Sequence, residues 1–132
     1  MVLSRSSFWL VAARLALAIC TFLTLWTAFA PPHGPKLHLF PWDKAEHFSA
    51  FFALTASAVL AFPRTRLVWI GAALSLSGAL IEVIQGLPWV NRDCDVMDWV
   101  ADTVAIGAVM GVIVAARLRR EVSADDHQSS AP

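Results

Sequence analysis

Four long apolar blocks constrain this chain more than any other feature of its sequence. They cover about residues 8–30, 46–62, 67–86 and 97–116, and each is followed by proline or by a group of arginines. A helix needs about 20 mostly apolar residues to cross a hydrocarbon core of roughly 30 Å. Each block is too long for a strand and too apolar on all sides for a surface helix. The sequence therefore predicts an all-α, polytopic membrane protein with a bundle of four transmembrane helices.

The composition agrees with this class. Hydrophobic residues make up 58% of the 132 residues and charged residues 15%, which is more apolar and less charged than a soluble domain of this size. The formal net charge is zero, and we expect no nucleic-acid partner. The first block resembles a signal peptide because Arg5 precedes it and Ala28 and Ala30 form a small-x-small site. Its apolar stretch is longer than a usual signal core, which favours a retained span.

The basic residues predict the orientation. Short loops rich in lysine and arginine stay cytoplasmic. Six arginines fall on one side of a four-span chain, whereas the other side carries only three basic residues: Arg5, Arg64, Arg66, Arg117, Arg119 and Arg120 against Lys36, Lys44 and Arg92. We therefore expect a cytoplasmic N-terminus (1–7), a transmembrane domain (8–116) and a basic, then disordered, cytoplasmic tail (117–132). The loops at 31–45 and 87–96 would face outward.

Polar residues that interrupt the apolar pattern gather at the outer ends of the spans. They are Asp43, Lys44, His47, Glu82, Gln85, Arg92, Asp95, Asp98 and Asp102. A rise of about 1.5 Å per residue places His47, Glu82 and Asp102 each roughly 21–23 Å above the cytoplasmic end of its span. Spacings of three, four and seven residues put each set on one helix face. Because ionisable groups at such depths face the bundle interior or a water-filled cavity, we predict one shared polar site.

Some of these residues have simpler interpretations. Asp43 and Asp98 are both candidate N-caps of the helices that they begin. Arg92 with Asp93 or Asp95 is a candidate solvated loop pair. Glu82 lies well inside an apolar block, where no capping role explains a carboxylate.

Three further features concern packing. Cys20 and Cys94 are expected to be free thiols. Gly107 and Gly111 form a GxxxG spacing, which we attribute to close packing inside the bundle, with homodimerisation as the alternative. The oligomeric state is not predicted. Tryptophans near the outer ends of the spans are typical of an aromatic belt: Trp42, Trp89 and Trp99.

The three polar groups, in this order, resemble the VanZ-like family of small multi-span membrane proteins. The similarity covers roughly residues 38–115 and rests on a D-K-x-x-H, E-x-x-Q, R-x-x-D-x-x-D pattern. This pattern matches Asp43, Lys44, His47, Glu82, Gln85, Arg92, Asp95 and Asp98. The family commonly has asparagine where this chain has Asp102, an extra acid that argues against a simple neutral hydrogen-bonding role. The family is named after a teicoplanin-resistance protein, so the resemblance implies a place in the bacterial plasma membrane and a link to the cell envelope.

Two functions follow as hypotheses. In the first, the site binds or acts on a membrane lipid or a lipid-linked envelope precursor. Its candidate catalytic residues are His47, Glu82 and Asp98, and its candidate ligand-binding residues are Asp43, Lys44, Gln85, Arg92, Asp95 and Asp102. A divalent cation is an option, with Asp43, His47, Glu82 and Asp98 as candidate ligands, because carboxylates and imidazole suit Mg, Mn or Zn. No standard metal motif is present.

In the second hypothesis, the same residues form a structural salt-bridge network or a partner-binding surface without catalysis. Ion or proton transport by a single subunit is disfavoured. Below the polar layer, the second and third blocks contain only serines and threonines among their polar residues.

Overall fold

The computed structural model describes residues 5–30, 42–90, 92 and 94–129. These residues form four helices, α1 (Arg5–Phe29), α2 (Asp43–Ala61), α3 (Leu67–Gln85) and α4 (Val96–Ser129). Each helix contains one of the apolar blocks, which confirms the predicted all-helical class. Lys36 and Asp93, which the sequence places in outer loops, lie outside the described residues.

Three helices in the described part of the chain are long and apolar enough to cross a membrane: Ser7–Phe29, Leu67–Gln85 and Val96–Ala124. Large apolar side chains such as Phe22 and Leu76, each 62% exposed, cover their outer surfaces. α2 does not meet the same description. Asp43, Lys44 and Glu46 charge its first turn, which lowers its mean hydropathy although its later turns are apolar.

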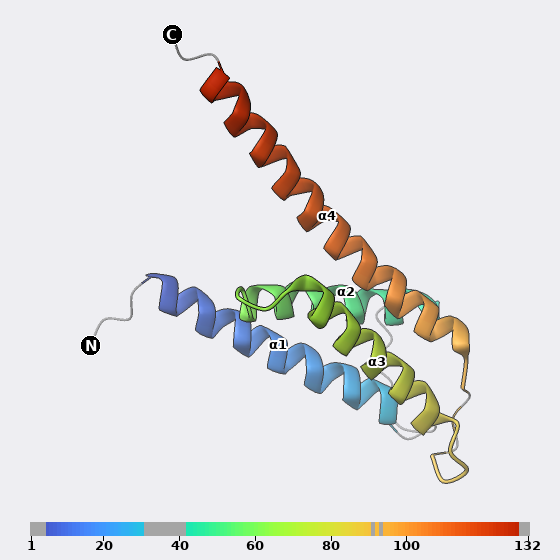
Figure 1. Ribbon diagram of the computed structural model, residues 1–132. Helices are drawn as coiled ribbons and strands as arrows, with labels where there is room; N and C mark the ends of the chain where they lie inside the picture. Colours follow the sequence, from blue (N-terminus) through green and yellow to red (C-terminus); the bar gives the residue numbers. More distant parts are fainter. Residues whose placement is uncertain (1–4, 31–41, 91, 93, 130–132) are drawn as a thin grey trace.

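α2 is the central helix of the fold. It packs most extensively against α4 and α1, α3 packs mainly against α4, and α1 barely touches α3. The chain runs up and down, so the C-terminal ends of α1 and α3 lie at the same end of the molecule as the N-terminal ends of α2 and α4 (Figure 1). The short connection between α2 and α3, residues 62–66, favours an antiparallel pair. The up-and-down arrangement brings the three polar groups of the sequence together.

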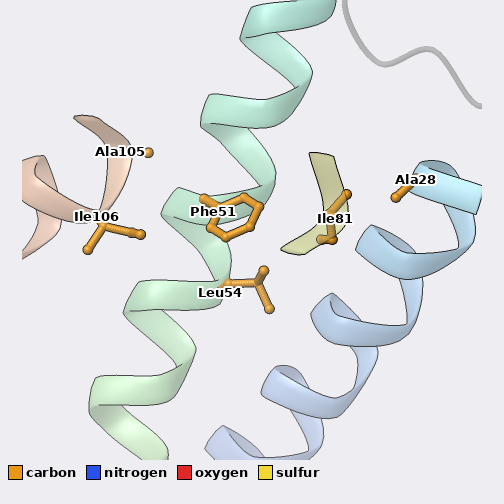
Figure 2. Close-up of a cluster of buried hydrophobic side chains, with 6 residues drawn as sticks. All are labelled: Ala28, Phe51, Leu54, Ile81, Ala105 and Ile106. Carbon is orange, nitrogen blue, oxygen red and sulfur yellow. The ribbon is translucent and has the colours of Figure 1, made fainter. Parts of the chain in front are cut away.

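The apolar core lies around α2. Its buried cluster consists of Ala28, Phe51, Leu54, Ile81, Ala105 and Ile106, contributed by all four helices (Figure 2). Alanines at these positions let the backbones approach closely, as small residues do in membrane helix pairs. Thr55 is fully buried without loss of hydrogen bonding, because its hydroxyl donates to the carbonyl of Phe51 at 2.6 Å.

Both glycines of α3 lie in close contacts with α4. A Cβ added at Gly78 would lie 2.7 Å from Oδ2 of Asp102, and one added at Gly71 would lie 2.7 Å from Sδ of Met110. Both glycines therefore lie where α3 packs closely against α4. The GxxxG pair behaves differently, since nothing lies within 4 Å of a Cβ at Gly107 or Gly111.

The interpretation of the GxxxG pair as packing inside the bundle is therefore wrong. α4 turns another face to the other helices, and that face carries Asp98, Asp102, Ala105, Ile106 and Val109, all buried. Gly107 and Gly111 lie on the opposite, exposed side of the helix. The sequence spacing identified a small-residue stripe correctly but not the face to which it belongs.

The segment after Ala116 also differs from the sequence expectation. We expected a basic and then disordered tail over 117–132, with disorder from about Glu121, but α4 continues to Ser129 and extends beyond the other three helices (Figure 1). No glycine or proline occurs between Gly111 and Pro132. Arginine, leucine, glutamate and alanine in this stretch all have high helix propensity, so the helix has no local reason to end at the last apolar residue.

Candidate functional site

The polar residues predicted from the sequence meet at the end of the bundle where α2 and α4 begin and α3 ends. Asp43, Lys44 and His47 come from the first two turns of α2, while Asp98 and Asp102 come from α4. The four-residue spacings place them on facing sides of these two helices. They form an interhelical cluster, with Glu82 on α3 held at its edge by the backbone of Asp95.

Lys44 joins α2 to the start of α4. Its Nζ lies 2.5 Å from Oδ2 of Asp95 and 3.0 Å from Oδ1 of Asp98. The hydrogen bonds to Asp95 and then Asp98 raise the pKa of Lys44. The bond from Lys44, followed by one from the backbone N–H of Met97, lowers the pKa of Asp95. Solvent screens the outer part of this network because Lys44 and Asp95 are both about a third to a half exposed.

The first turn of α4 shows which residue caps that helix. Asp95 precedes the helix, and its Oδ1 accepts a hydrogen bond from the backbone N–H of Met97 at 2.8 Å. Asp98 lies inside the first turn, so its predicted role as the cap is wrong. Asp43 likewise belongs to the first turn of α2 rather than capping it, because Trp42 is the residue that precedes the helix. Both aspartates are therefore left to other roles.

His47 lies between two carboxylates of α4. Its Nδ1 is 3.1 Å from Oδ1 of Asp102, and its Nε2 is 3.7 Å from Oδ2 of Asp98. An ionised carboxylate only accepts hydrogen bonds, so with Asp102 ionised the bond requires the proton of His47 on Nδ1. Asp102 is 1% exposed, and the absence of a side chain at Gly78 makes room for it. This contact joins α2, α3 and α4 at one point.

Glu82 is the least satisfied polar group among the described residues. It is 4% exposed, and its Oε2 accepts a hydrogen bond from the backbone N–H of Asp95 at 3.0 Å. Its Oε1 is buried and has no hydrogen-bond partner in the described part of the chain. An unpaired buried carboxylate oxygen is costly. A carboxylate in this state is suited to receive a ligand, a cation or a water molecule.

Gln85 has a structural partner. Its Nε2 donates to the carbonyl of Ala28 at 2.9 Å, so the amide ties the last turn of α3 to the last turn of α1. Helix C-termini leave carbonyl groups without intrahelical partners, and this bond satisfies one of them. Because Nε2 is used in this bond, the predicted ligand-binding role of Gln85 falls mainly to its side-chain carbonyl oxygen.

A small polar cavity of about 100 Å³ opens at this end of the bundle. Asp43 and His47 of α2, Gln85 of α3 and the partly buried Arg92 all line it, together with the C-terminal turns of α1. Its other lining residues are Thr24, Trp26, Thr27, Ala28, Ala30, Glu46, Ala50, Phe51 and Ile81. The cavity lining does not include Lys44, Glu82, Asp95, Asp98 or Asp102.

The contribution of α1 was missed at the level of the sequence. Thr24 and Thr27 face the polar cavity, three residues apart near the outer end of the first block. The same depth argument that selected His47 and Glu82 would have found them. Threonine gives a weak sequence signal for a site because its hydroxyl can be buried at little cost by bonding to the preceding turn of its own helix. Thr27 does so, since its hydroxyl donates to the carbonyls of Leu23 and Thr24.

Three residues are placed to hold a cation. Asp43, His47 and Asp98 each offer one ligand atom, and these atoms lie within 4.8 Å of one another. Their donor chemistry fits Mg, Mn or Zn, although an ion there would share Asp98 with the Lys44 ammonium. Glu82, the fourth candidate from the sequence, is not part of this group. The candidate metal set is thereby narrowed to three residues.

The arrangement is suited to proton transfer at His47. Asp102 contacts the ring at Nδ1, Nε2 lies 3.7 Å from Oδ2 of Asp98, and His47 lines the polar cavity. An imidazole held by a carboxylate at one nitrogen is a common general acid or base. Of the predicted catalytic residues, His47 and Asp98 are adjacent. Asp102, predicted to bind ligand, is the closest partner of His47.

Comparison with known proteins adds no relative. No protein-family model, no curated protein and no solved structure matches this chain.

Proposed function

We propose that this is a cell-envelope membrane protein whose polar site, at the extracytoplasmic ends of its helices, binds or acts on a lipid-linked or phosphate-bearing amphiphile. The observation that carries the proposal is the polar cavity, in which Arg92 and His47 face the same space at the ends of α1, α2 and α3. A cation and a proton-transferring group around one cavity are suited to a phosphate-bearing head group.

The proposed membrane position includes α2 as a fourth span. Its polar first turns would lie at the level of the head groups, and its apolar turns from Phe48 onward would cross the hydrocarbon core. Because α2 is surrounded by three helices that carry the lipid-facing surface, it needs less hydrophobicity than they do. The basic residues Arg64 and Arg66, between α2 and α3, would lie on the cytoplasmic side.

The contacts favour Arg92 over Lys44 as the phosphate ligand. Lys44 is already paired with two carboxylates, so a phosphate would have to displace one of them. Arg92 lines the cavity, and its planar guanidinium suits bidentate contact with phosphate oxygens. His47, oriented by Asp102, would then act on a group bound next to Arg92.

The resemblance to the VanZ-like family supports the same proposal. Its motif residues are the residues that cluster at one end of the bundle, and the family implies a link to the bacterial envelope. Asp102, where the family commonly has asparagine, makes the closest contact with His47. An acid at this position gives His47 a stronger acceptor than asparagine would, which is consistent with acid–base chemistry in this chain.

A second candidate is a structural network without ligand. The ion pairs of Lys44 with Asp95 and Asp98, and the bond between His47 and Asp102, favour it, because they join α2 to α4 without any added group. Buried networks of this kind can specify helix packing. Under this alternative the cavity and the unpaired oxygen of Glu82 would have no role.

Glu82→Gln separates the two candidates. A glutamine keeps a carbonyl oxygen for the N–H of Asp95 and places a neutral amide at the unpaired position. If the site binds a ligand there, the thermal unfolding midpoint in detergent stays close to that of the unmodified chain while ligand binding is lost. If the cluster is only structural, the midpoint also stays close, because the bond from Asp95 is kept, and the unmodified chain itself binds no alkyl phosphate.

The phosphate proposal has its own matched pair of variants. Arg92→Gln should weaken binding of an alkyl phosphate to the reconstituted protein, measured by microscale thermophoresis. Arg64→Gln removes the same charge from the exposed turn between α2 and α3 and should leave binding unchanged. Equal effects of the two substitutions would show that only the overall charge matters and would reject a site at Arg92.

A further inference from the structure

A second and larger cavity lies between α1 and α3. Its volume is about 510 Å³, within the roughly 300–1,000 Å³ of typical small-molecule sites. α2 forms its floor with Phe51, Leu54, Ala58 and Phe62, which follow one another at helical spacing. The polar cavity, at about 100 Å³, falls below the typical range. A typical small-molecule ligand therefore does not fit in the polar cavity alone, and the atoms beyond its head group must lie outside that cavity.

The two cavities are neighbours. Thr24, Phe51 and Ile81 line both of them, so the polar and the apolar cavity adjoin at these three side chains. Figure 2 shows Phe51 of α2, Ile81 of α3 and Ala28 of α1 in one buried cluster. From Phe51 to Phe62 the floor extends roughly 16 Å along α2. We name this space the α1–α3 groove.

Small side chains hollow out the groove. Ala73 and Ser77 of α3 and Thr21 of α1 line it, and all three are exposed. α1 and α3 both pack on α2 but hardly contact each other. The short side chains on their facing sides leave the space between them open. The groove is partly open to the outside of the bundle, and its surface is overwhelmingly apolar. It has the shape and chemistry for a flexible hydrocarbon chain.

We propose that the α1–α3 groove holds one hydrocarbon chain of an amphiphile whose phosphate-bearing head occupies the polar cavity beside Arg92 and His47. This inference rests on the proposed function, which it extends from the head group to the chain. The shared lining of the two cavities carries it, because a head at Arg92 and a chain along α2 are then close enough to belong to one molecule.

The head group must supply the selectivity. Lipid tails are as apolar as leucine, so a chain gains little by moving from bilayer to groove. A chain placed there by chance would therefore be exchanged freely with bulk lipid. Anchoring of the head at Arg92 makes occupancy specific. Chain occupancy should consequently depend on Arg92, which distinguishes a bound amphiphile from membrane lipid filling a gap.

Photo-crosslinking tests the groove. The full chain is reconstituted in nanodiscs of unlabelled phosphatidylcholine, and hexadecyl phosphate with a mid-chain diazirine is the probe. Mass spectrometry after photolysis should find adducts several-fold enriched at Leu17, Leu54 and Leu74 of the groove over the lipid-facing Leu76 and Leu80. An even distribution over both sets would overturn the proposal in favour of bulk lipid.

Matched variants complete the experiment. Ala73→Trp fills the groove and should abolish the enriched adducts, whereas Ala72→Trp adds the same side chain at the neighbouring exposed position, outside the groove, and should not. Thr21→Trp fills the groove from the opposite wall, so that a folding defect of one variant does not decide the result. Circular dichroism of each variant checks that the helices are retained.

Arg92→Gln separates failure of this inference from failure of the proposed function. Loss of groove adducts in Arg92→Gln supports both. Capture of the probe that depends on Arg92 but is unaffected by Ala73→Trp would overturn the groove and leave the proposed function standing. Groove adducts that are unchanged by Arg92→Gln would overturn the coupling of head and chain, and with it the proposed role of Arg92.

Discussion

Gly78→Ala should destabilise the bundle through Asp102. The added Cβ would lie 2.7 Å from Oδ2 of Asp102 and 3.3 Å from Cζ of Phe51, well inside the ~3.5–4.0 Å at which non-bonded atoms pack favourably. Asp102 cannot turn away cheaply, because it is 1% exposed and bonded to His47. Overpacking of this kind costs about 1–3 kcal/mol.

Gly71→Ala is the matched control on the same helix. Its Cβ would also come within 2.7 Å of a neighbour, but that neighbour is the flexible thioether of Met110, which can rotate at low cost. Both substitutions replace a buried glycine of α3 by alanine, so their effects on helix propensity cancel. The difference in free energy of unfolding therefore isolates the packing term, and we expect Gly78→Ala to be less stable by about 1–3 kcal/mol.

Unfolding in mixed micelles by increasing SDS measures both variants. In an Asp102→Ala background the contact with Oδ2 is gone, so the penalty of Gly78→Ala should fall, and the double-mutant cycle gives the coupling energy. The reasoning fails if Gly78→Ala is as stable as Gly71→Ala, or if its penalty is the same with and without Asp102. Either result would mean that Asp102 does not point at Gly78.

Three further predictions concern the cluster. Lys44 lowers the pKa of Asp95, so this pair should stabilise the fold fully above pH 3.8, the ordinary pKa of the carboxyl, and the stabilisation should be lost as the pH falls through the lower pKa of the folded state. Thermal unfolding midpoints measured against pH should show this loss. Asp95→Asn should flatten that part of the profile. Asp102→Ala leaves the His47 ring without its acceptor, which should cost about 1–3 kcal/mol in the same SDS titration, whereas no loss would contradict a buried bond. Asp43 is exposed, so Asp43→Asn should weaken Mn²⁺ binding, followed by electron paramagnetic resonance, without lowering stability; absence of Mn²⁺ binding to the unmodified chain would remove the cation from the account.

The helices and the meeting of the polar residues were predictable because both depend on spacing. An apolar block of about 20 residues is sufficient to define a span, and residues three and four apart share a helix face. Equal depth then brought His47 and Asp102 to the same level. None of this required knowledge of which helix packs against which.

The parts that were not predictable depend on helix rotation and on pairwise partners. Gly107 and Gly111 have the spacing of a packing motif, yet α4 turns its acidic and alanine-rich face to the bundle. Asp95 caps α4 because the helix begins one residue after it, a boundary that sequence patterns locate only within a few residues. Gln85 bonds to a carbonyl of α1 that carries no sequence signal at all.

The most direct test of a polar site at the outer face uses the native Cys94, which is exposed immediately before Asp95. With Cys20→Ser, Cys94 is the single thiol of the chain, and a membrane-impermeant maleimide is applied to intact cells of a bacterial expression host. The account predicts labelling of Cys94 in intact cells, and labelling of an Arg64→Cys variant without Cys94 only after the cells are opened. Labelling of Arg64→Cys in intact cells with protection of Cys94 would place the polar site on the cytoplasmic side and contradict the account.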